Sequence, residues 1–145
     1  MSLSAASTGE CCSCDVYEKL EEEACCGKNG YLLHYGLKNC RMFDSPEVIS
    51  RFSEAGRKFV QCTRECLIKH LQNMFKKDRP TCDDIYDSAV DSHTDCYLKC
   101  GFCEICKTEK WALFKGYHVT DFFSVKSLKT VFRVLRACGP LSCLL

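Results

Sequence analysis

Fifteen cysteines in a chain of 145 residues are the feature that most constrains the fold. They make up about a tenth of the sequence, above the roughly 8–10% that marks a disulfide scaffold. Cytosolic proteins rarely carry so many thiols unless the thiols hold metal, so the count indicates an oxidising, extracellular compartment. A domain of this length can also bury about 68–70% of the surface that its unfolded chain exposes. The disulfides are therefore expected to reinforce a hydrophobic core.

The N-terminal part of the chain combines closely spaced cysteines with helix and turn signals. The acidic segment Asp15–Ala24 is predicted to be a short helix, followed by a turn at Gly27–Gly30 and a further helix over Tyr31–Cys40. Ahead of them, Met1–Glu10 is small and polar and lacks the apolar region of a signal peptide. We expect this stretch to be disordered or a leader, and residues 11–145 to form a single helical domain.

Hydrophobic periodicity and capping residues predict three longer helices. The first is predicted to begin at Ser45-Pro46, where a capping serine precedes a proline, and to run to about Phe75. Gly56, inside it, indicates a bend or a close helix crossing. The second begins after the cap Thr81, and the last begins at Thr120-Asp121. The positions expected on the buried faces are Phe52, Ala55, Phe59, Cys62, Cys66, Ile85, Ala89, Cys96, Cys100, Phe122, Val125, Leu128, Phe132 and Leu135. Because no alternating strand pattern appears, the expected fold class is all-α, a disulfide-stapled bundle of antiparallel helices.

Two pairs of cysteines repeat at four-residue spacing on neighbouring predicted helices. Cys62 and Cys66 share one face of the first helix, and Cys96 and Cys100 share one face of the second. If the two helices pack antiparallel, both pairs face the seam between them. The spacing then predicts the bridges Cys66–Cys96 and Cys62–Cys100, a ladder that keeps the helices in register.

The order and spacing of five cysteines resemble those of a known family. They read Cys66-x15-Cys82-x13-Cys96-x6-Cys103-x34-Cys138. The flanking segments Gly56–Val60 and Cys96–Lys99 agree as well. Four long gaps that match together are specific, and between about Cys40 and Cys138 the chain resembles the stanniocalcins.

This resemblance implies a disulfide pairing and a function. It implies the bridges Cys66–Cys96 and Cys103–Cys138, with Cys82 reaching the N-terminal cluster through Cys25 or Cys26. Cys40 is also expected to be disulfide-bonded. It further implies an all-helical subunit, a covalent homodimer, and a secreted, hormone-like protein that acts in calcium and phosphate homeostasis or inhibits a pappalysin-type metalloproteinase. The alternative is a secreted cysteine-rich protein with an unrelated target on the same scaffold.

Departures from the family pattern favour a divergent, invertebrate member. Cys62, Cys100 and Cys106 are additional cysteines, and no Asn-x-Ser/Thr glycosylation acceptor is present. Because fifteen is an odd number, at least one cysteine is free or joins another chain. The long tail that carries the family's dimer-forming cysteine is missing, and Cys143, five residues after Cys138, is a loose substitute for that cysteine. We expect it, or one of the N-terminal cluster, to form the intermolecular bridge.

The main alternative to disulfide bonding is that some of the cysteines bind a metal. Cys100, Cys103 and Cys106 follow C-x2-C-x2-C spacing, the start of an iron–sulfur motif, but Lys110 occupies the position of the next cysteine. The histidines, which lie apart in the sequence with no motif around them, are His34, His70, His93 and His118. We therefore expect no metal, no other cofactor and no enzymatic activity.

The net charge of the chain and a basic stripe on one predicted helix indicate which classes of partner the protein can bind. Twenty basic and nineteen acidic residues give a net charge of +1, unlike a nucleic-acid-binding domain. No apolar run is long enough for a membrane span. On the last predicted helix, a basic stripe at 3-4-3 spacing consists of Lys126, Lys129, Arg133 and Arg136. The stripe is either an ordinary solvated face or a dock for an acidic partner: a protein receptor, an extracellular protease or a sulfated glycan.

Overall fold

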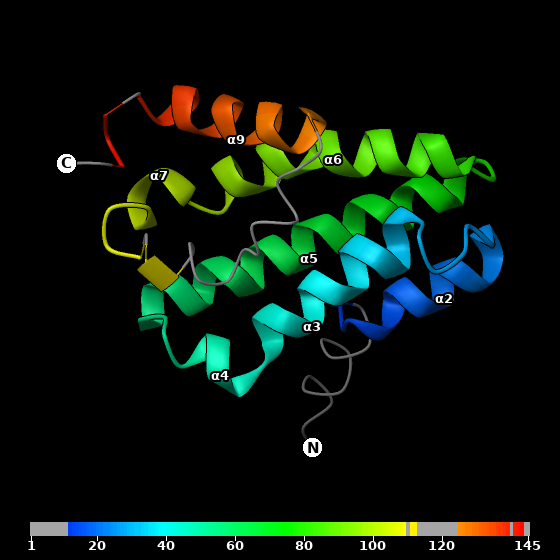
Figure 1. The fold of residues 1–145 in the computed structure, drawn as a ribbon, viewed down its shortest axis with the longest axis horizontal. Coiled ribbons are helices and arrows are strands. Elements are labelled where there is room, and N and C mark those ends of the chain that lie inside the picture. Colours follow the sequence, from blue (N-terminus) through cyan, green and yellow to red (C-terminus); the bar gives the residue numbers. More distant parts are fainter. Residues whose placement is uncertain (1–11, 110, 113–124, 140, 144–145) are drawn as a thin grey trace, which may run out of the picture.

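The computed structural model describes residues 12–109, 111–112, 125–139 and 141–143, and for residues 125–128 the backbone alone. Within these ranges the chain forms helices and contains no strand, which confirms the predicted disulfide-stapled all-α fold class. The helices α5 and α6, whose bounds are given below, run side by side through the centre (Figure 1). The N-terminal helices pack against one side of this pair, and α9 packs against α6 on the other.

The N-terminal helix and the turn after it lie where the sequence predicts them. α2 (Asp15–Ala24) has the predicted bounds. Gly27 takes a positive φ of 87°, and the backbone N–H of Gly30 donates to the Gly27 carbonyl at 3.0 Å, which closes the turn. The next predicted helix is present, but it begins as a π-helix, η1 (Tyr31–Leu37), and continues as α3 (Lys38–Asp44).

The prediction of one continuous helix from Ser45 to about Phe75 is wrong. The chain instead forms a single turn, α4 (Pro46–Ile49), and then a long helix, α5 (Glu54–Lys77). Between them Phe52 turns inward and is only 3% exposed. Ser53 then caps the new helix, because its hydroxyl accepts a hydrogen bond from the Gly56 backbone N–H at 3.3 Å. The predicted helix is therefore divided in two by the cap at Ser53 and by the burial of Phe52.

The next helix, α6 (Cys82–Lys99), begins at the predicted cap. The Thr81 hydroxyl accepts from the Asp84 backbone N–H at 3.1 Å, and the Asp84 carboxylate accepts in return from the Thr81 backbone N–H at 3.4 Å. This reciprocal capping box satisfies two donors that a helix start leaves free. Gly101, with φ of 91°, separates α6 from the short helix α7 (Phe102–Ile105).

α9 (Val125–Cys138) packs against α6, but with a different face from the one predicted. Thr130 and Val134, four residues apart, are its buried positions at 5% and 2% exposure. The prediction that Phe132 is buried is wrong, because that side chain is 68% exposed. A disulfide at Cys138, on the same face as Val134, fixes the rotation of the helix and leaves Phe132 on another face. The expected burial of Phe122, Val125 and Leu128 lies outside the described side chains.

The buried side chains form two clusters. The larger cluster joins α2, η1, α5 and α6, and its most completely buried members are Leu32, Ile68, Leu71 and Ile85. The smaller cluster lies at the start of α5 around Phe52, Phe59 and Ile105. The disulfides therefore accompany a real core, as the chain length predicts.

Candidate functional site

Two disulfides form a ladder between α5 and α6. Cys62–Cys100 and Cys66–Cys96 each hold their Cα atoms 5.7 Å apart. Because residues four apart lie one above the other on a helix, the two bridges are successive rungs between antiparallel helices. They close segments with sequence separations of 38 and 30 residues, and bridges of this kind typically stabilise by about 2–4 kcal/mol. The four-residue spacing of the cysteines in the sequence predicts this pairing, and the structure confirms it.

Two further disulfides clamp the C-terminal end of α9 to the α7 region. Cys103 pairs with Cys138, and Cys106 pairs with Cys143, both with Cα atoms 5.1 Å apart. The expectation that Cys143 bridges to another chain is therefore wrong. Cys103 and Cys106 lie three residues apart, so both face the same side of one helical turn. Gly139, with φ of 98°, lets the chain turn after Cys138 and bring Cys143 back to its partner.

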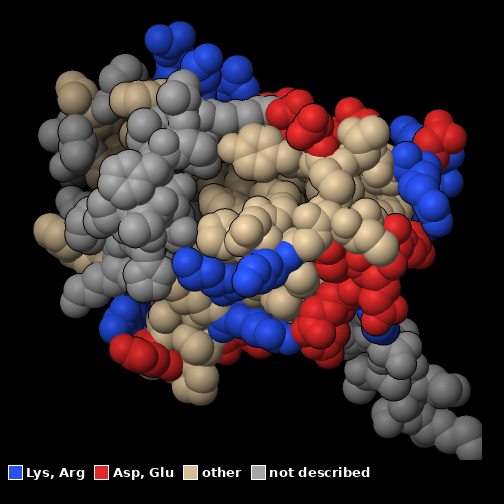
Figure 2. Space-filling model, turned by 45° about the vertical axis from the view of Figure 1, so that its right-hand side comes forward, with Lys and Arg blue, Asp and Glu red and all other residues tan. Residues whose placement is uncertain are grey.

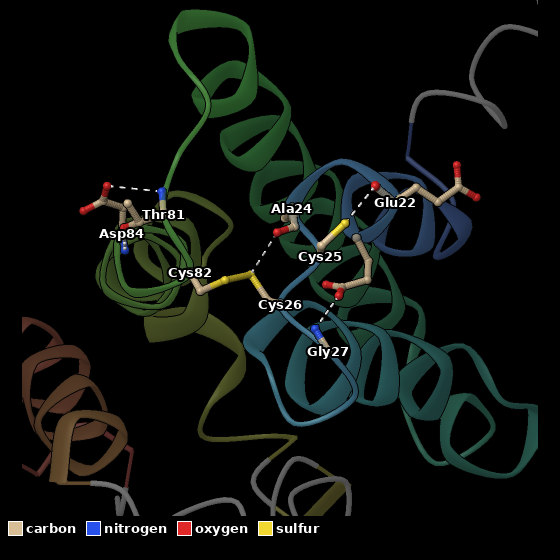
Figure 3. The surroundings of a disulfide bond; sticks show 9 residues. Glu22, Ala24, Cys25, Cys26, Gly27, Thr81, Cys82 and Asp84 are labelled. Carbon is tan, nitrogen blue, oxygen red and sulfur yellow. Dashed lines mark hydrogen bonds between the residues drawn. A yellow bond between two sulfur atoms is a disulfide. The ribbon is translucent and has the colours of Figure 1, made fainter.

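The N-terminal part of the chain is attached to α6 by the bridge Cys26–Cys82, with a Cα separation of 5.7 Å. The sequence left Cys25 and Cys26 as alternatives, and the backbone decides between them. Cys25 ends α2 in the left-handed conformation, with φ of 51°, which directs Cys26 toward the start of α6 (Figure 3). The Cys25 thiol is exposed and free, and it donates to the Glu22 carbonyl at 3.4 Å.

The sixth bridge, Cys14–Cys40, joins the start of α2 to α3 and was not paired from the sequence. Neither cysteine belongs to an i, i+4 pair, so no periodicity indicates its partner. Only the packing of α2 on η1, which leads into α3, brings them together. Cys106 was likewise recognised only as an additional cysteine, because its partner lies after the last helix.

The three cysteines of the iron–sulfur-like spacing lie in three different disulfides, to Cys62, Cys138 and Cys143. Among the described residues no group of three or more metal-binding side chains comes together. His93 is buried and its Nε2 lies 3.0 Å from the Tyr31 hydroxyl. His70 contacts the Ser88 hydroxyl at 2.8 Å, and His34 is exposed. His118 lies outside the described residues.

The basic stripe lies on the solvent side of α9. Lys129, Arg133 and Arg136 are exposed, whereas the Lys126 side chain is outside the described part of the chain. Arg133 forms an ion pair of 3.8 Å with Asp91 on α6, but both side chains are 60% exposed. Exposed pairs of this kind contribute about 0–1 kcal/mol, so Arg133 stays available to a partner. In Figure 2, basic side chains gather at the top of the molecule, where α9 lies in Figure 1.

An aromatic side chain accompanies these charges. Phe132 stands next to Arg133 in the sequence and, by helix geometry, on the neighbouring face of α9. We call Phe132, Lys129, Arg133 and Arg136 the outer face of α9. Aromatic residues and arginine are enriched in protein interfaces, and lysine is depleted there. The outer face of α9 thus combines the chemistry of a protein-binding surface with a position held by two disulfides.

Within the described helices, no segment is both long and apolar enough to cross a membrane. The family model of the stanniocalcins matches residues 3–141, well beyond the segment that carried the resemblance in the sequence. No curated protein and no solved structure matches the chain. The matched family is secreted, hormone-type and non-enzymatic, and the disulfide framework fits an extracellular protein. The chain belongs to the stanniocalcin family.

Proposed function

We propose that the chain acts outside the cell by binding a protein partner through the outer face of α9. The observation that carries this proposal is the double clamp Cys103–Cys138 and Cys106–Cys143. A surface held in one orientation loses less conformational entropy when a partner binds it. The exposed guanidinium groups of Arg133 and Arg136 would form charge-assisted hydrogen bonds with carboxylates of an acidic partner.

Two partner classes are consistent with the family. One is a receptor through which the protein regulates calcium and phosphate transport, and the other is a pappalysin-type metalloproteinase that the protein inhibits. In both, the protein contributes no catalytic group and acts by occupying a surface. An acidic surface on the partner would steer association, and raised salt would slow it.

A charge-removal series tests the proposal. Replacing Lys126, Lys129, Arg133 and Arg136 with serine should weaken inhibition of a purified pappalysin-type protease, or the calcium response of cells, at least tenfold. The matched control replaces four exposed basic residues elsewhere, Lys69, Lys76, Lys77 and Arg79. Control activity should stay within twofold of wild type. If both variants lose the same activity, the loss follows from the change in net charge and not from the position of the charges on α9, which would contradict the proposal.

The same variants also show whether the partner is instead a sulfated glycan or an unrelated target. Salt-dependent retention on heparin that falls only in the α9 variant would assign the stripe to a glycan. If the folded wild-type protein neither inhibits the protease nor changes calcium flux, the scaffold has kept the family fold and taken another target, and the hormone-type role is wrong.

We also propose that two copies are joined through Cys25. Cys143 is used within the chain, and Cys25 is an exposed free thiol. An odd number of cysteines leaves at least one without an intrachain disulfide partner. The exposed position next to the end of α2 would let two copies approach without unfolding either (Figure 3).

A further inference from the structure

A cavity of about 80 Å³ lies where the two buried clusters meet, and its lining comes from α2, η1, α3, α5 and α6. Of its lining residues, Tyr17 and Tyr31 belong to the larger cluster, whereas Phe59 and Val60 belong to the smaller one. Protein interiors contain few voids larger than a single water, which needs roughly 10–15 Å³. The two clusters therefore leave a space that the described side chains do not fill.

A continuous row of ring contacts runs along the wall of the cavity. The ring centroids of Tyr31 and Tyr35 lie 5.4 Å apart, and those of Tyr35 and His93 lie 5.7 Å apart. The row continues from His93 to Tyr97 at 5.7 Å and from Tyr97 to Phe59 at 6.1 Å. All five residues line the cavity, and they come from η1, α5 and α6. Each ring is packed against its neighbours, which keeps it from closing the space.

Two of these rings are placed by the π-helix η1, which carries Tyr31 and Tyr35. π-helical turns are rare and occur frequently at functional sites. On the same helix, Gly36 lets the Tyr17 ring of α2 approach so closely that a Cβ at position 36 would overlap it. Gly36 and Tyr17 also line the cavity. A rare type of helix and a close glycine contact thus both shape this wall.

The surface that the cavity offers to a guest is mainly apolar. Three polar atoms of its lining residues, the Thr63 hydroxyl, the side-chain oxygen of Asn39 and Nε of Arg64, are closed to solvent. The charge of Arg64 is balanced by Asp44, with 2.8 Å between Nη1 and the carboxylate oxygen. Burial lowers the pKa of His93 to about 4, so its imidazole is neutral near pH 7. Among the described lining residues, an ionised guest would therefore meet no unpaired opposite charge.

The size of the cavity and its open side select the shape of the guest. An apolar cavity of roughly 150 Å³ stays dry and takes up benzene. The space here is about half as large, so it is too small to enclose such a ring. It is not fully closed, and three of its lining residues, Tyr35, Phe43 and Leu67, are partly exposed to solvent. An unbranched aliphatic chain is narrower than a ring, so its end can enter while the rest of the chain leaves through the open side.

We propose that this cavity binds the end of an unbranched aliphatic chain, which packs against the row of rings and against Val60 and Leu67. Binding is favoured because each CH₂ group that enters the cavity leaves water. A polar or charged head group, where the ligand has one, stays outside. The guest is therefore either a free hydrocarbon or the tail of a lipid. The site is independent of the outer face of α9, and its test does not depend on a protein partner.

Methyl and amide NMR spectra of the full oxidised chain test this assignment. The first two probes are n-hexane and cyclohexane, which have the same number of carbon atoms and differ in breadth. We expect n-hexane to cause saturable shifts at the lining residues Val60, Thr63 and Leu67, and to bind at least tenfold more tightly than cyclohexane. Ile85, which is buried elsewhere in the core, should not shift. Octanoate distinguishes the sources: binding at least as tight as that of n-hexane assigns a lipid tail, and weaker binding assigns a free hydrocarbon.

Two leucine variants separate the site from general packing effects. Leu67→Phe places a larger side chain in the wall of the cavity and should weaken n-hexane binding at least tenfold. Leu98→Phe is the matched control, because Leu98 is also half-buried but does not line the cavity. Binding of n-hexane to that variant should equal wild type.

A third variant makes the opposite change, so the test does not depend on whether Leu67→Phe folds. Val60→Ala widens the cavity, and cyclohexane should bind to it at least tenfold more tightly than to wild type. Absence of saturable shifts at the lining residues, or cyclohexane binding to wild type as tightly as n-hexane, would overturn the proposal. Equal behaviour of the two leucine variants, or unchanged cyclohexane binding in Val60→Ala, would also contradict it.

Discussion

The carboxylate of Glu109 accepts a hydrogen bond from the backbone N–H of Ser53 at 3.0 Å, although 56 residues separate the two in the sequence. The Ser53 hydroxyl donates to the same carboxylate oxygen while it caps α5. Glu109 is only 5% exposed. A Cβ at Gly56 would lie 2.8 Å from this oxygen, so the glycine makes room for the Glu109 carboxylate at the start of α5. The segment after α7 is thereby attached to the start of α5.

Replacing Glu109 with alanine should destabilise the fold by about 1–3 kcal/mol, because it removes the buried carboxylate that accepts from both Ser53 donors. Glu109→Gln should lose less, since the amide keeps an acceptor oxygen. Chemical denaturation measures both. The exposed Glu104 provides the control, and its alanine variant should stay within about 0.5 kcal/mol of wild type. A Glu109→Ala variant as stable as that control would contradict the attachment.

Removing one rung of the α5–α6 ladder should weaken the fold without changing its register. The double variant Cys62→Ser, Cys100→Ser is expected to lose about 2–4 kcal/mol of unfolding free energy and to remain folded, because Cys66–Cys96 still fixes the alignment. Denaturant titration under oxidising conditions gives the loss. The reduced wild-type protein should lose more unfolding free energy than this variant, because reduction breaks every bridge and should unfold the domain more fully.

Stability should depend on pH through His93. Burial, and secondarily the charge of His70, lowers its pKa in the folded protein from 6.5 to about 4. Above pH 6.5 the imidazole is neutral in both states and contributes no pH dependence. As the pH falls from 6.5 toward 4, the unfolded chain binds a proton that the folded chain does not. The unfolding free energy should therefore fall by about 3 kcal/mol across this window.

Two histidine variants test this assignment by denaturation at several pH values. His93→Gln removes the titrating group and keeps a polar partner for the Tyr31 hydroxyl, so its stability should change less between pH 6.5 and 4. His34→Gln, at an exposed site, should keep the wild-type slope. An unchanged slope in the His93 variant would show that another group carries the pH dependence.

Cys25→Ser should convert a covalent dimer to monomer in non-reducing electrophoresis, whereas Cys143→Ser should not. The physical reason is that Cys143 is already bonded to Cys106, while the Cys25 thiol is exposed. Intact mass under the same conditions reports the number of bridges. Wild-type protein that migrates only as monomer would remove the case for a Cys25 bridge.

Helix positions and the central pairing followed from the sequence because they depend on local rules. The caps Thr81 and Ser45 and the i, i+4 cysteines are signals that operate within one or two helical turns. The break after α4 was missed because Phe52 was assigned to a continuing stripe. The Ser53 cap that begins the new helix is also bound by the carboxylate of Glu109, which is distant in the sequence.

The errors at the C-terminal end have a common cause. The sequence shows that α9 is amphipathic, but the face that packs against α6 is chosen by the disulfide at Cys138, so Phe132 was placed in the core. Cys143 was assigned to another chain because the family has a dimer-forming cysteine in its tail, whereas its partner is Cys106, 37 residues earlier in the same chain.

Peptide mapping of the oxidised protein by mass spectrometry, without reduction, is the most direct test of the braced α9 surface. We expect one peptide pair joined through Cys103–Cys138 and another through Cys106–Cys143, both within a single chain. Recovery of Cys143 in a bridge between two chains, or of Cys103 and Cys138 as free thiols, would contradict it.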